Sequence, residues 1–339
     1  MREVFITSLD AGQRLDKYLG KLLRSAQKGF IYKMLRKKNI TLNGKKADGS
    51  EKLKDQDVIR LYFSDETIER LTKGENGAEE AENGNWPYRR LDILYEDENV
   101  LIVDKPSGVL SQKAQPQDLS MVEYITGYLL RTGALTVGDL ATFRPGVCNR
   151  LDRNTSGVLT AGKTIAGLQG LTEVFRDRTA EKYYYCIVKG TVKEPLVLDG
   201  YLLKDHDRNR VEILDEPVKD AQRIITAYRP AAAASGFTLL EVHLVTGRSH
   251  QIRAHLASIG MPILGDPKYG DDGLNAGLRR QYGIRSQMLH AQRLEFGEME
   301  GALLPLSGRT VSAPLPAPFK TFLREEMGIG DGDLEFERP

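Results

Sequence analysis

The sequence has few of the residues on which several classes of protein depend. It contains two cysteines, Cys148 and Cys186, among 339 residues, so no disulfide framework is expected. No uninterrupted apolar run is long enough to span a bilayer, and the N-terminus lacks the charged-then-apolar pattern of a secretory signal. We therefore expect a cytoplasmic protein that does not bind a membrane.

The usual motifs for metals and dinucleotides are also missing. His250 and His255 are five residues apart, whereas a His-x-x-x-His zinc site places its histidines four apart, and no carboxylate nearby has ligand spacing. No Gly-x-Gly-x-x-Gly follows an expected strand and opens a helix, which argues against a doubly wound nucleotide-binding fold. We expect no metal site.

Charge is unevenly distributed along the chain, although the net charge is only +1. Residues 1–63 carry 15 Lys and Arg against 7 Asp and Glu, whereas residues 64–85 carry 2 against 7. A basic module followed by an acidic tether is typical of a protein with a polyanionic partner. The length allows two domains. We predict a basic domain over 1–63, a flexible acidic linker over 64–87, a second domain over 88–326 and an acidic tail over 327–339.

The basic domain is expected to contain two helices and a hairpin. Apolar residues at helical spacing predict a helix over 14–23, and Ser25 is a candidate cap for a second helix. Asn43-Gly44 between two apolar runs is a strong hairpin cue. The stretch 13–63 resembles an S4-type RNA-binding domain, which implies RNA contacts from Arg14, Lys17, Lys33, Lys37 and Lys38. The alternative is a helix pair with a solvated lysine face.

The most specialised stretch is 146–160, which reads GVCNRLDRNTSGVLT. Asp152 lies between two arginines and is followed by small residues suited to a tight turn. If Asp152 faces a cleft, the arginines would keep it ionised and could bind an anionic substrate. The alternative is an ion pair that only fixes a loop, because Arg14-Leu15-Asp16 repeats the tripeptide in an expected helix.

Two further stretches carry residues suited to a site. Residues 181–190 are typical of a strand, and its Tyr184 could either stack on a base in a cleft or pack within the sheet. Arg248 and Arg253 are five residues apart and would splay on a regular helix. A strand-to-helix junction could aim one at an acid and the other at a phosphate. Lys105 follows a strand and is either a loop lysine or a phosphate contact.

Three motifs in this order resemble the RluA-type family of pseudouridine synthases. They are Asp-Lys-Pro-Ser-Gly at 104–108, Arg-Leu-Asp-Arg-Asn-Thr-Ser-Gly at 150–157 and Thr-Gly-Arg-Ser-His-Gln-Ile-Arg-Ala-His at 246–255, with shorter matches at 182–184, 262–266 and 269–270. An S4-type module in front is frequent in this family. The resemblance implies an α+β fold with a mixed, largely antiparallel sheet, flanking helices and a central cleft.

The resemblance also implies a reaction, the isomerisation of uridine to pseudouridine in RNA without a metal or redox cofactor. Asp152 would be the nucleophile or the group that deprotonates the sugar, and both roles stay open. Arg253 would keep Asp152 ionised, and Tyr184 would stack on the uracil and assist proton removal from C5. Lys105, Arg150 and Arg248 would contact flanking phosphates. Ile252 or Leu244 would form the apolar floor under the ring.

One position departs from the family pattern. The family usually has His immediately before Arg-Leu-Asp, whereas this chain has Asn149, which forms hydrogen bonds but does not titrate near neutrality. This substitution bears on substrate choice and loop geometry. Large-subunit ribosomal RNA is the expected substrate and tRNA the alternative, and we expect a monomer.

Two other functions compete with this one. A carboxylate-based hydrolase generally needs a second acid opposite the first, for which Asp266 is the candidate. A non-catalytic RNA-binding or ribosome-assembly factor would use the second domain only as a binding surface.

Overall fold

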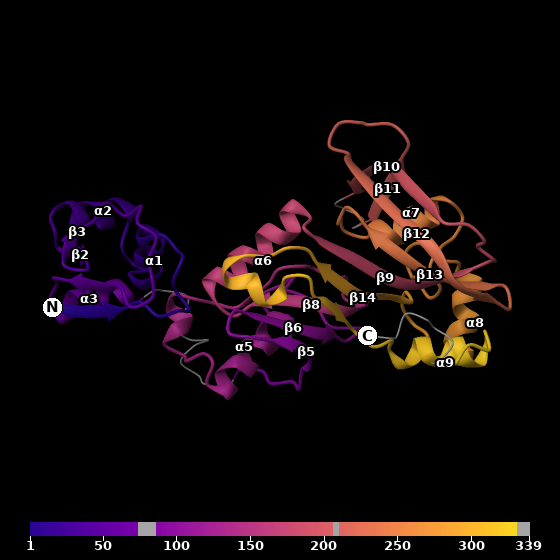
Figure 1. The fold of residues 1–339 in the computed structure, drawn as a ribbon, viewed down its shortest axis with the longest axis horizontal. Coiled ribbons are helices and arrows are strands. Elements are labelled where there is room, and N and C mark those ends of the chain that lie inside the picture. The colour runs from indigo at the N-terminus through magenta and orange to yellow at the C-terminus, as the bar shows by residue number, and fades with distance from the viewer. Residues whose placement is uncertain (74–85, 206–209, 331–339) are drawn as a thin grey trace.

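The computed structural model describes residues 1–73, 86–205 and 210–330, and Figure 1 shows a small N-terminal domain beside a larger body. Half of the predicted linker, at 74–85, and the end of the predicted tail, at 331–339, lie outside the described residues. Among the described residues, no helix combines the length and apolar character needed to cross a membrane. The same residues contain no group of three or more His, Cys, Asp or Glu placed to hold a metal ion.

The N-terminal domain packs three helices on a small antiparallel sheet with strand order β1-β4-β2-β3. Asn43 and Gly44 join β2 and β3 with positive φ angles of 51° and 73°, which is the backbone that a two-residue hairpin turn requires. The predicted hairpin is therefore confirmed. The elements are β1 (Arg2–Phe5), α1 (Leu15–Leu22), α2 (Lys28–Arg36), β2 (Ile40–Leu42), β3 (Lys45–Lys46), β4 (Val58–Leu61) and α3 (Asp65–Thr72).

Two details of this domain differ from the prediction. Ser25 does not cap α2, which begins after Gln27; its hydroxyl instead donates to the carbonyl of Lys73. The prediction of a flexible linker from residue 64 is wrong for 65–72, because these residues form α3 and bury Ile68 and Leu71 in the domain core. Two apolar residues among many acids gave too weak a pattern to indicate a helix. The N-terminal domain thus extends to residue 73.

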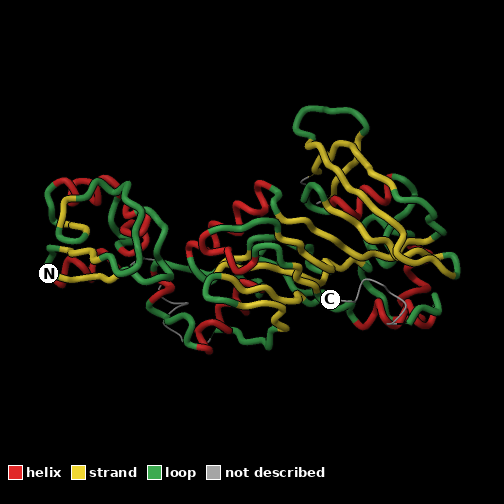
Figure 2. The backbone as a smooth tube through the Cα atoms, in the orientation of Figure 1, coloured by secondary structure: helices red, strands yellow, loops and turns green. Residues whose placement is uncertain are grey.

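The larger body is built on an 11-stranded sheet, which Figure 2 shows as one continuous layer. Its strand order is β11-β10-β12-β13-β9-β14-β8-β6-β5, with β15 beside β14 and β7 beside β8. The pairs are antiparallel except for β14 with β8, so the mixed, largely antiparallel sheet that was predicted is confirmed. The strands are β5 (Asp92–Glu96), β6 (Val100–Lys105), β7 (Gly146–Val147), β8 (Ser156–Gly162), β9 (Ala180–Lys189), β10 (Leu196–Asp205), β11 (Arg210–Leu214), β12 (Gln222–Ala234), β13 (Phe237–Leu244), β14 (Leu289–Phe296) and β15 (Thr310–Ser312).

Helices cover the sheet on both faces around β6 and β8. Alternate residues of β6 belong to two different apolar clusters, Leu101 and Val103 to one and Val100 and Ile102 to the other. Burial on both faces explains why β6 reads as an unbroken apolar run. The helices are α5 (Met121–Thr132), α6 (Ile165–Asp177), α7 (Gln251–Ser258), α8 (Asp272–Tyr282) and α9 (Ala317–Glu325), with short 3₁₀ turns at Asp139–Ala141 and Gly301–Leu306.

The N-terminal domain contacts the larger body directly. The Thr142 hydroxyl donates to the buried carboxylate of Asp10 at 3.0 Å, and the amide of Ile165 donates to the carbonyl of Leu9 at 2.9 Å. At the other end of the chain, Met327 is buried and Ile329 packs on the main core. The predicted tail over 327–339 is therefore wrong for its first residues, which belong to the body.

Candidate active site

The loop that carries Asp152 runs between β7 and β8 and is fixed by the segment after β6. The Ser111 hydroxyl donates to the carbonyl of Leu151 at 2.9 Å and accepts from the Leu151 amide at 3.0 Å. The Ser107 hydroxyl donates to the carbonyl of Asn154 at 2.8 Å. Bonds on both sides of Asp152 hold the loop to a rigid strand end, so the carboxylate has a defined position.

Lys105 belongs to this support and does not lie at the edge of a cleft. Its side chain is fully buried, and its ammonium donates to the carbonyls of Pro106, Val109 and Arg153 at 2.7–3.0 Å. Burial lowers the pKa of Lys105 to about 7, although the negative charges of Asp152 and Asp104 raise it. Three carbonyls match the three hydrogens of the ammonium and leave none for a phosphate. The predicted phosphate contact by Lys105 is therefore wrong.

Asn149 also has a defined place in this loop. Its amide nitrogen donates to the carbonyl of Val158 at 3.0 Å, and its amide oxygen accepts from the backbone amide and hydroxyl of Thr160 at 2.7 and 3.0 Å. The side chain thus adds to the contacts between this segment and β8 beyond the end of β7. It supplies a donor and an acceptor that do not change with pH near neutrality.

The Thr-Ser-Gly sequence brings the loop against β14. Gly157 has φ of 109°, and a Cβ atom at this position would lie 2.0 Å from the carbonyl oxygen of Ala291. Only glycine permits this approach, at the point where β8 pairs with β14. Gln287, just before β14, donates to the Thr155 hydroxyl at 3.3 Å. The tight contact closes the loop after Asp152.

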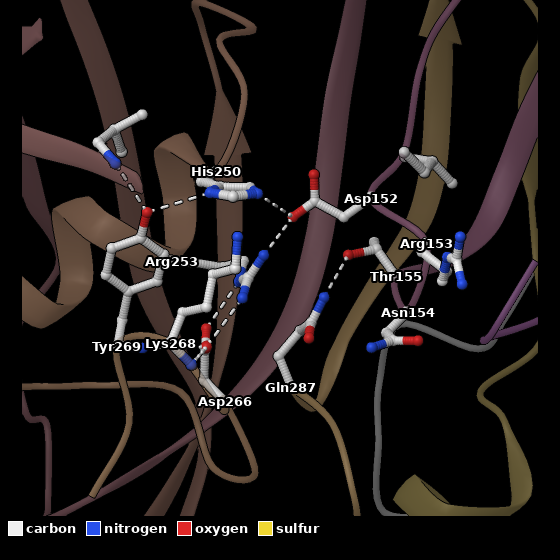
Figure 3. Close-up of polar contacts among 12 residues, drawn as sticks. Asp152, Arg153, Asn154, Thr155, His250, Arg253, Asp266, Lys268, Tyr269 and Gln287 are labelled. Carbon is white, nitrogen blue, oxygen red and sulfur yellow. Dashed lines mark hydrogen bonds and ion pairs between the residues drawn. The ribbon is translucent and has the colours of Figure 1, made fainter. Parts of the chain in front are cut away.

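Arg253 on α7 joins two carboxylates (Figure 3). Its Nη1 donates to Asp152 Oδ2 at 2.7 Å, while Nε and Nη2 donate to the two oxygens of Asp266 at 2.7 and 2.9 Å. The Arg253 side chain is 5% exposed, Asp266 is fully buried and Asp152 is 24% exposed. Burial opposes the charge of Arg253, but the two carboxylates together raise its pKa above the ordinary value. The guanidinium is therefore a permanent charge that faces the more exposed carboxylate.

Asp266 acts as an anchor for Arg253. Burial favours its neutral form, yet the bonds from Arg253 and from the backbone amides of Lys268 and Tyr269 leave its pKa below the usual 3.8. Both carboxylate oxygens are occupied and its side chain is inaccessible. Asp266 is thus not available as a second acid for hydrolysis.

Tyr184 lies on β9, and Ile252 directly precedes Arg253 on α7. Both side chains are buried in the main core, together with Leu151, which directly precedes Asp152. Burial and, to a smaller extent, the charge of Asp152 raise the pKa of Tyr184. Its hydroxyl therefore keeps its proton at neutral pH. The structure thus brings together the three predicted catalytic residues, although Arg253 lies 101 positions after Asp152.

The other side chains predicted to contact RNA differ in whether they already form an ion pair. Arg150 and Arg248 are exposed, and neither side chain has an ion pair in the part of the chain that the structure describes. In the N-terminal domain, Arg14 pairs with Asp16 at 3.0 Å and is not free. The exposed lysines of that domain without an ion pair to a described residue include Lys17, Lys33, Lys37 and Lys38.

Sequence reasoning missed His250 and Tyr269. His250 Nε2 lies 4.0 Å from Asp152 Oδ2, and His250 Nδ1 lies 3.0 Å from the Tyr269 hydroxyl. From the sequence alone we considered His250 only as a metal ligand. His250 precedes Arg253 by three residues, and this spacing at the start of a helix places both residues on one side. His255 bonds to Thr226 at 3.0 Å and takes no part in the site.

A separate hollow of about 580 Å³ lies on the other face of the sheet. It is lined by Tyr183, His243 and Arg293 among others, and both faces of the Tyr183 ring are covered, by the His243 ring at 4.9 Å and the Arg293 guanidinium at 3.8 Å. Neighbouring residues of a strand point to opposite faces, so this hollow is remote from the carboxylate beside Tyr184.

Comparison with known proteins gives consistent matches. Residues 99–258, which include Asp152, Tyr184 and Arg253, match a family model described as RNA pseudouridylate synthase. The chain is 31% identical over 289 residues to ribosomal large subunit pseudouridine synthase C of Vibrio cholerae, covering 84% of this chain and 85% of that protein. It is 31% identical over 329 residues to ribosomal large subunit pseudouridine synthase D of Xanthomonas campestris, covering 94% and 89%. Among solved structures, human RNA pseudouridylate synthase domain containing 4 shares the fold, with a TM-score of 0.55, 23% identity and coverage of 69% of this chain and 92% of that chain.

Proposed function

Because the chain belongs to the RluA-type family of RNA pseudouridine synthases, isomerases that convert uridine to pseudouridine in RNA, we propose that it modifies large-subunit ribosomal RNA with Asp152 as the reacting carboxylate. The names of the two similar bacterial proteins support this RNA over tRNA. The observation that carries the catalytic assignment is the pair between Asp152 and Arg253. The Asp152 side chain is 24% exposed, whereas that of Arg253 is 5% exposed.

The reaction requires one bond to be exchanged for another. The C1′–N1 bond breaks, the uracil turns, C5 bonds to C1′, and the proton on C5 is lost while N1 gains one. No atom is gained overall and no oxidation state changes across the whole nucleoside, so a carboxylate suffices without a metal or redox cofactor. Asp152 either attacks the sugar or removes a proton from it. Both roles need the carboxylate without its proton, and the Arg253 guanidinium donates to it at 2.7 Å.

The apolar side of the site suits a base that has left its stack, as enzymes acting on bases generally require. Tyr184, which interacts electrostatically with Asp152, offers an aromatic surface, and Ile252, directly before Arg253, is the aliphatic candidate. Since the Tyr184 hydroxyl keeps its proton, this residue is better suited to stacking than to accepting the C5 proton. Arg150 and Arg248, exposed and free of ion pairs to other described residues, contact the flanking phosphates.

The direct test is to incubate the protein with transcripts of large-subunit ribosomal RNA and of tRNA, and to measure pseudouridine and free uracil by mass spectrometry. We expect pseudouridine in the ribosomal RNA and no free uracil. Pseudouridine in tRNA alone would contradict the substrate assignment. Release of uracil without isomerisation would favour a hydrolase, and binding without either product would favour a non-catalytic RNA-binding factor.

We further propose that the N-terminal domain is an S4-like RNA-binding domain whose lysines contact phosphates. The triple substitution Lys33→Gln, Lys37→Gln and Lys38→Gln should weaken RNA binding and reduce the slope of log affinity against log salt by about 0.7–0.9 for each phosphate that is no longer neutralised. The measurement is fluorescence anisotropy at several salt concentrations. The same three lysines replaced by arginine are the matched control, because the charges are kept and the slope should be unchanged. An unaltered slope in the triple variant would argue against an RNA role for these lysines.

A further inference from the structure

His250 occupies a backbone conformation that is costly for its side chain. It lies directly before α7 with φ of 58° and ψ of 10°, in the left-handed region that residues other than glycine adopt rarely, Asn, Asp and His more often than the rest. Its side chain makes no capping bond to the helix. Figure 3 shows the ring pointing instead toward Asp152. A strained residue whose side chain does not serve its own helix indicates a use at the site.

The contacts of the ring determine which nitrogen carries the proton. The backbone amide of Val211 donates to the Tyr269 oxygen at 3.0 Å, which directs the Tyr269 hydrogen toward His250 Nδ1, also at 3.0 Å. A ring whose Nδ1 accepts a hydrogen bond carries its proton on Nε2. Burial lowers the pKa of His250 below 6.5. The positive charges of Arg253 and Lys268 also lower it, whereas the negative charge of Asp152 raises it, and the ring is neutral at pH 7.

The Nε2 proton therefore points at the reacting carboxylate. Nε2 lies 4.0 Å from Asp152 Oδ2, beyond hydrogen-bonding distance by about 1 Å. Catalytic hydrogen bonds are often long without substrate and shorten when it binds. Arg253 already donates to the same Oδ2 atom, whereas Asp152 Oδ1 has no hydrogen bond to any described residue. Two donors on Oδ2 would leave Oδ1 as the free oxygen.

We propose that His250 is a positioning residue for Asp152: its neutral Nε2–H, oriented by Tyr269, donates to Oδ2 when RNA is bound and leaves Oδ1 to react with the sugar. This inference rests on the proposed role of Asp152. It assigns a role to His250 and Tyr269 that requires neither to exchange a proton with the substrate.

A pair of amide substitutions tests this proposal. The amide nitrogen of glutamine reaches about as far as His Nε2, whereas that of asparagine reaches only as far as Nδ1. His250→Asn keeps a residue suited to the left-handed backbone but removes the donor to Asp152. We expect its single-turnover rate to fall about tenfold to a hundredfold with RNA affinity unchanged, as for loss of a hydrogen bond to a charged group. His250→Gln should recover most of this rate.

Tyr269→Phe provides a second measurement on a different residue. It removes the hydroxyl that orients the ring, and we expect an intermediate loss of rate without a change in RNA affinity.

The proposal is overturned if His250→Asn is as fast as the wild type. It is also overturned if His250→Gln is as slow as His250→Asn, which would indicate a purely structural residue. A wild-type protein that forms no pseudouridine would instead overturn the function on which the proposal rests.

Discussion

Replacing Asp152 with asparagine is expected to reduce pseudouridine formation by more than about 10⁴-fold while leaving RNA affinity within about twofold of the wild type. Asparagine has nearly the same shape but can neither attack the sugar nor accept its proton, and losses of this size follow removal of a reacting group in other enzymes. RNA affinity is retained because phosphate contacts dominate binding and Asp152 makes none. Single-turnover kinetics and anisotropy measure the two quantities separately.

Asp266→Asn is the matched control for this experiment. Both aspartates bond to Arg253, but only Asp152 is accessible, with 24% of its side chain exposed. Asp266→Asn keeps an oxygen for Arg253 and retains the reacting carboxylate, so its rate should fall far less than that of Asp152→Asn. An Asp152→Asn variant that modifies RNA at the wild-type rate would remove Asp152 from the mechanism. Equal losses in the two variants would contradict the assignment of Asp152 as the single reacting acid.

Replacing Arg253 with methionine is expected to lower the free energy of unfolding by about 3–5 kcal/mol at pH 7, in addition to abolishing activity. Methionine fills much of the space of the arginine stem but leaves Asp266 as a buried carboxylate without its partner, and breaking a buried pair in this way typically costs that much. Urea denaturation measures the loss. The double variant Arg253→Met, Asp266→Asn should regain part of the stability but no activity.

The pH dependence of this loss has a defined sign. In the wild type the pKa of Asp266 is held below 3.8, so the stabilisation from its charge is present above that value and is lost only as the pH falls through the lowered pKa. Without Arg253, burial raises the pKa of Asp266, and protonation relieves the buried charge. The difference in stability between wild type and Arg253→Met should therefore shrink as the pH falls from 7 toward 5. A constant difference over that interval would mean that Asp266 is not the source of the loss.

Several parts of the molecule could be predicted because their causes are local. The Asn43-Gly44 hairpin follows from two residues that tolerate positive φ. The strand expected over 181–190 follows from its aromatic and β-branched residues, and β9 occupies 180–189. The grouping of Asp152 with Tyr184 and Arg253 came from motif resemblance and not from periodicity.

The errors concern residues whose environment is set by distant parts of the chain. Lys105 was expected at a cleft edge because nothing in its own segment shows that Arg153, 48 positions away, supplies one of its acceptors. The roles of His250 and Asp266 depend likewise on Tyr269 and Arg253, reached through turns that spacing does not specify. In α3, the acidic composition concealed two apolar residues that pack on the N-terminal domain.

The place of β14 in the sheet has a consequence for how the protein is made. Residues 289–296 come late in the chain, yet they lie between β8 and β9 in the sheet. The strands on the β8 side include the one that follows Asp152. The strands on the β9 side include the one that carries Tyr184 and β13, which precedes α7 and Arg253. A chain still emerging from the ribosome has both sets of strands but no strand to unite them. The sheet is therefore complete only after residue 296 has been made, and we expect nascent chains that end before β14 to be inactive.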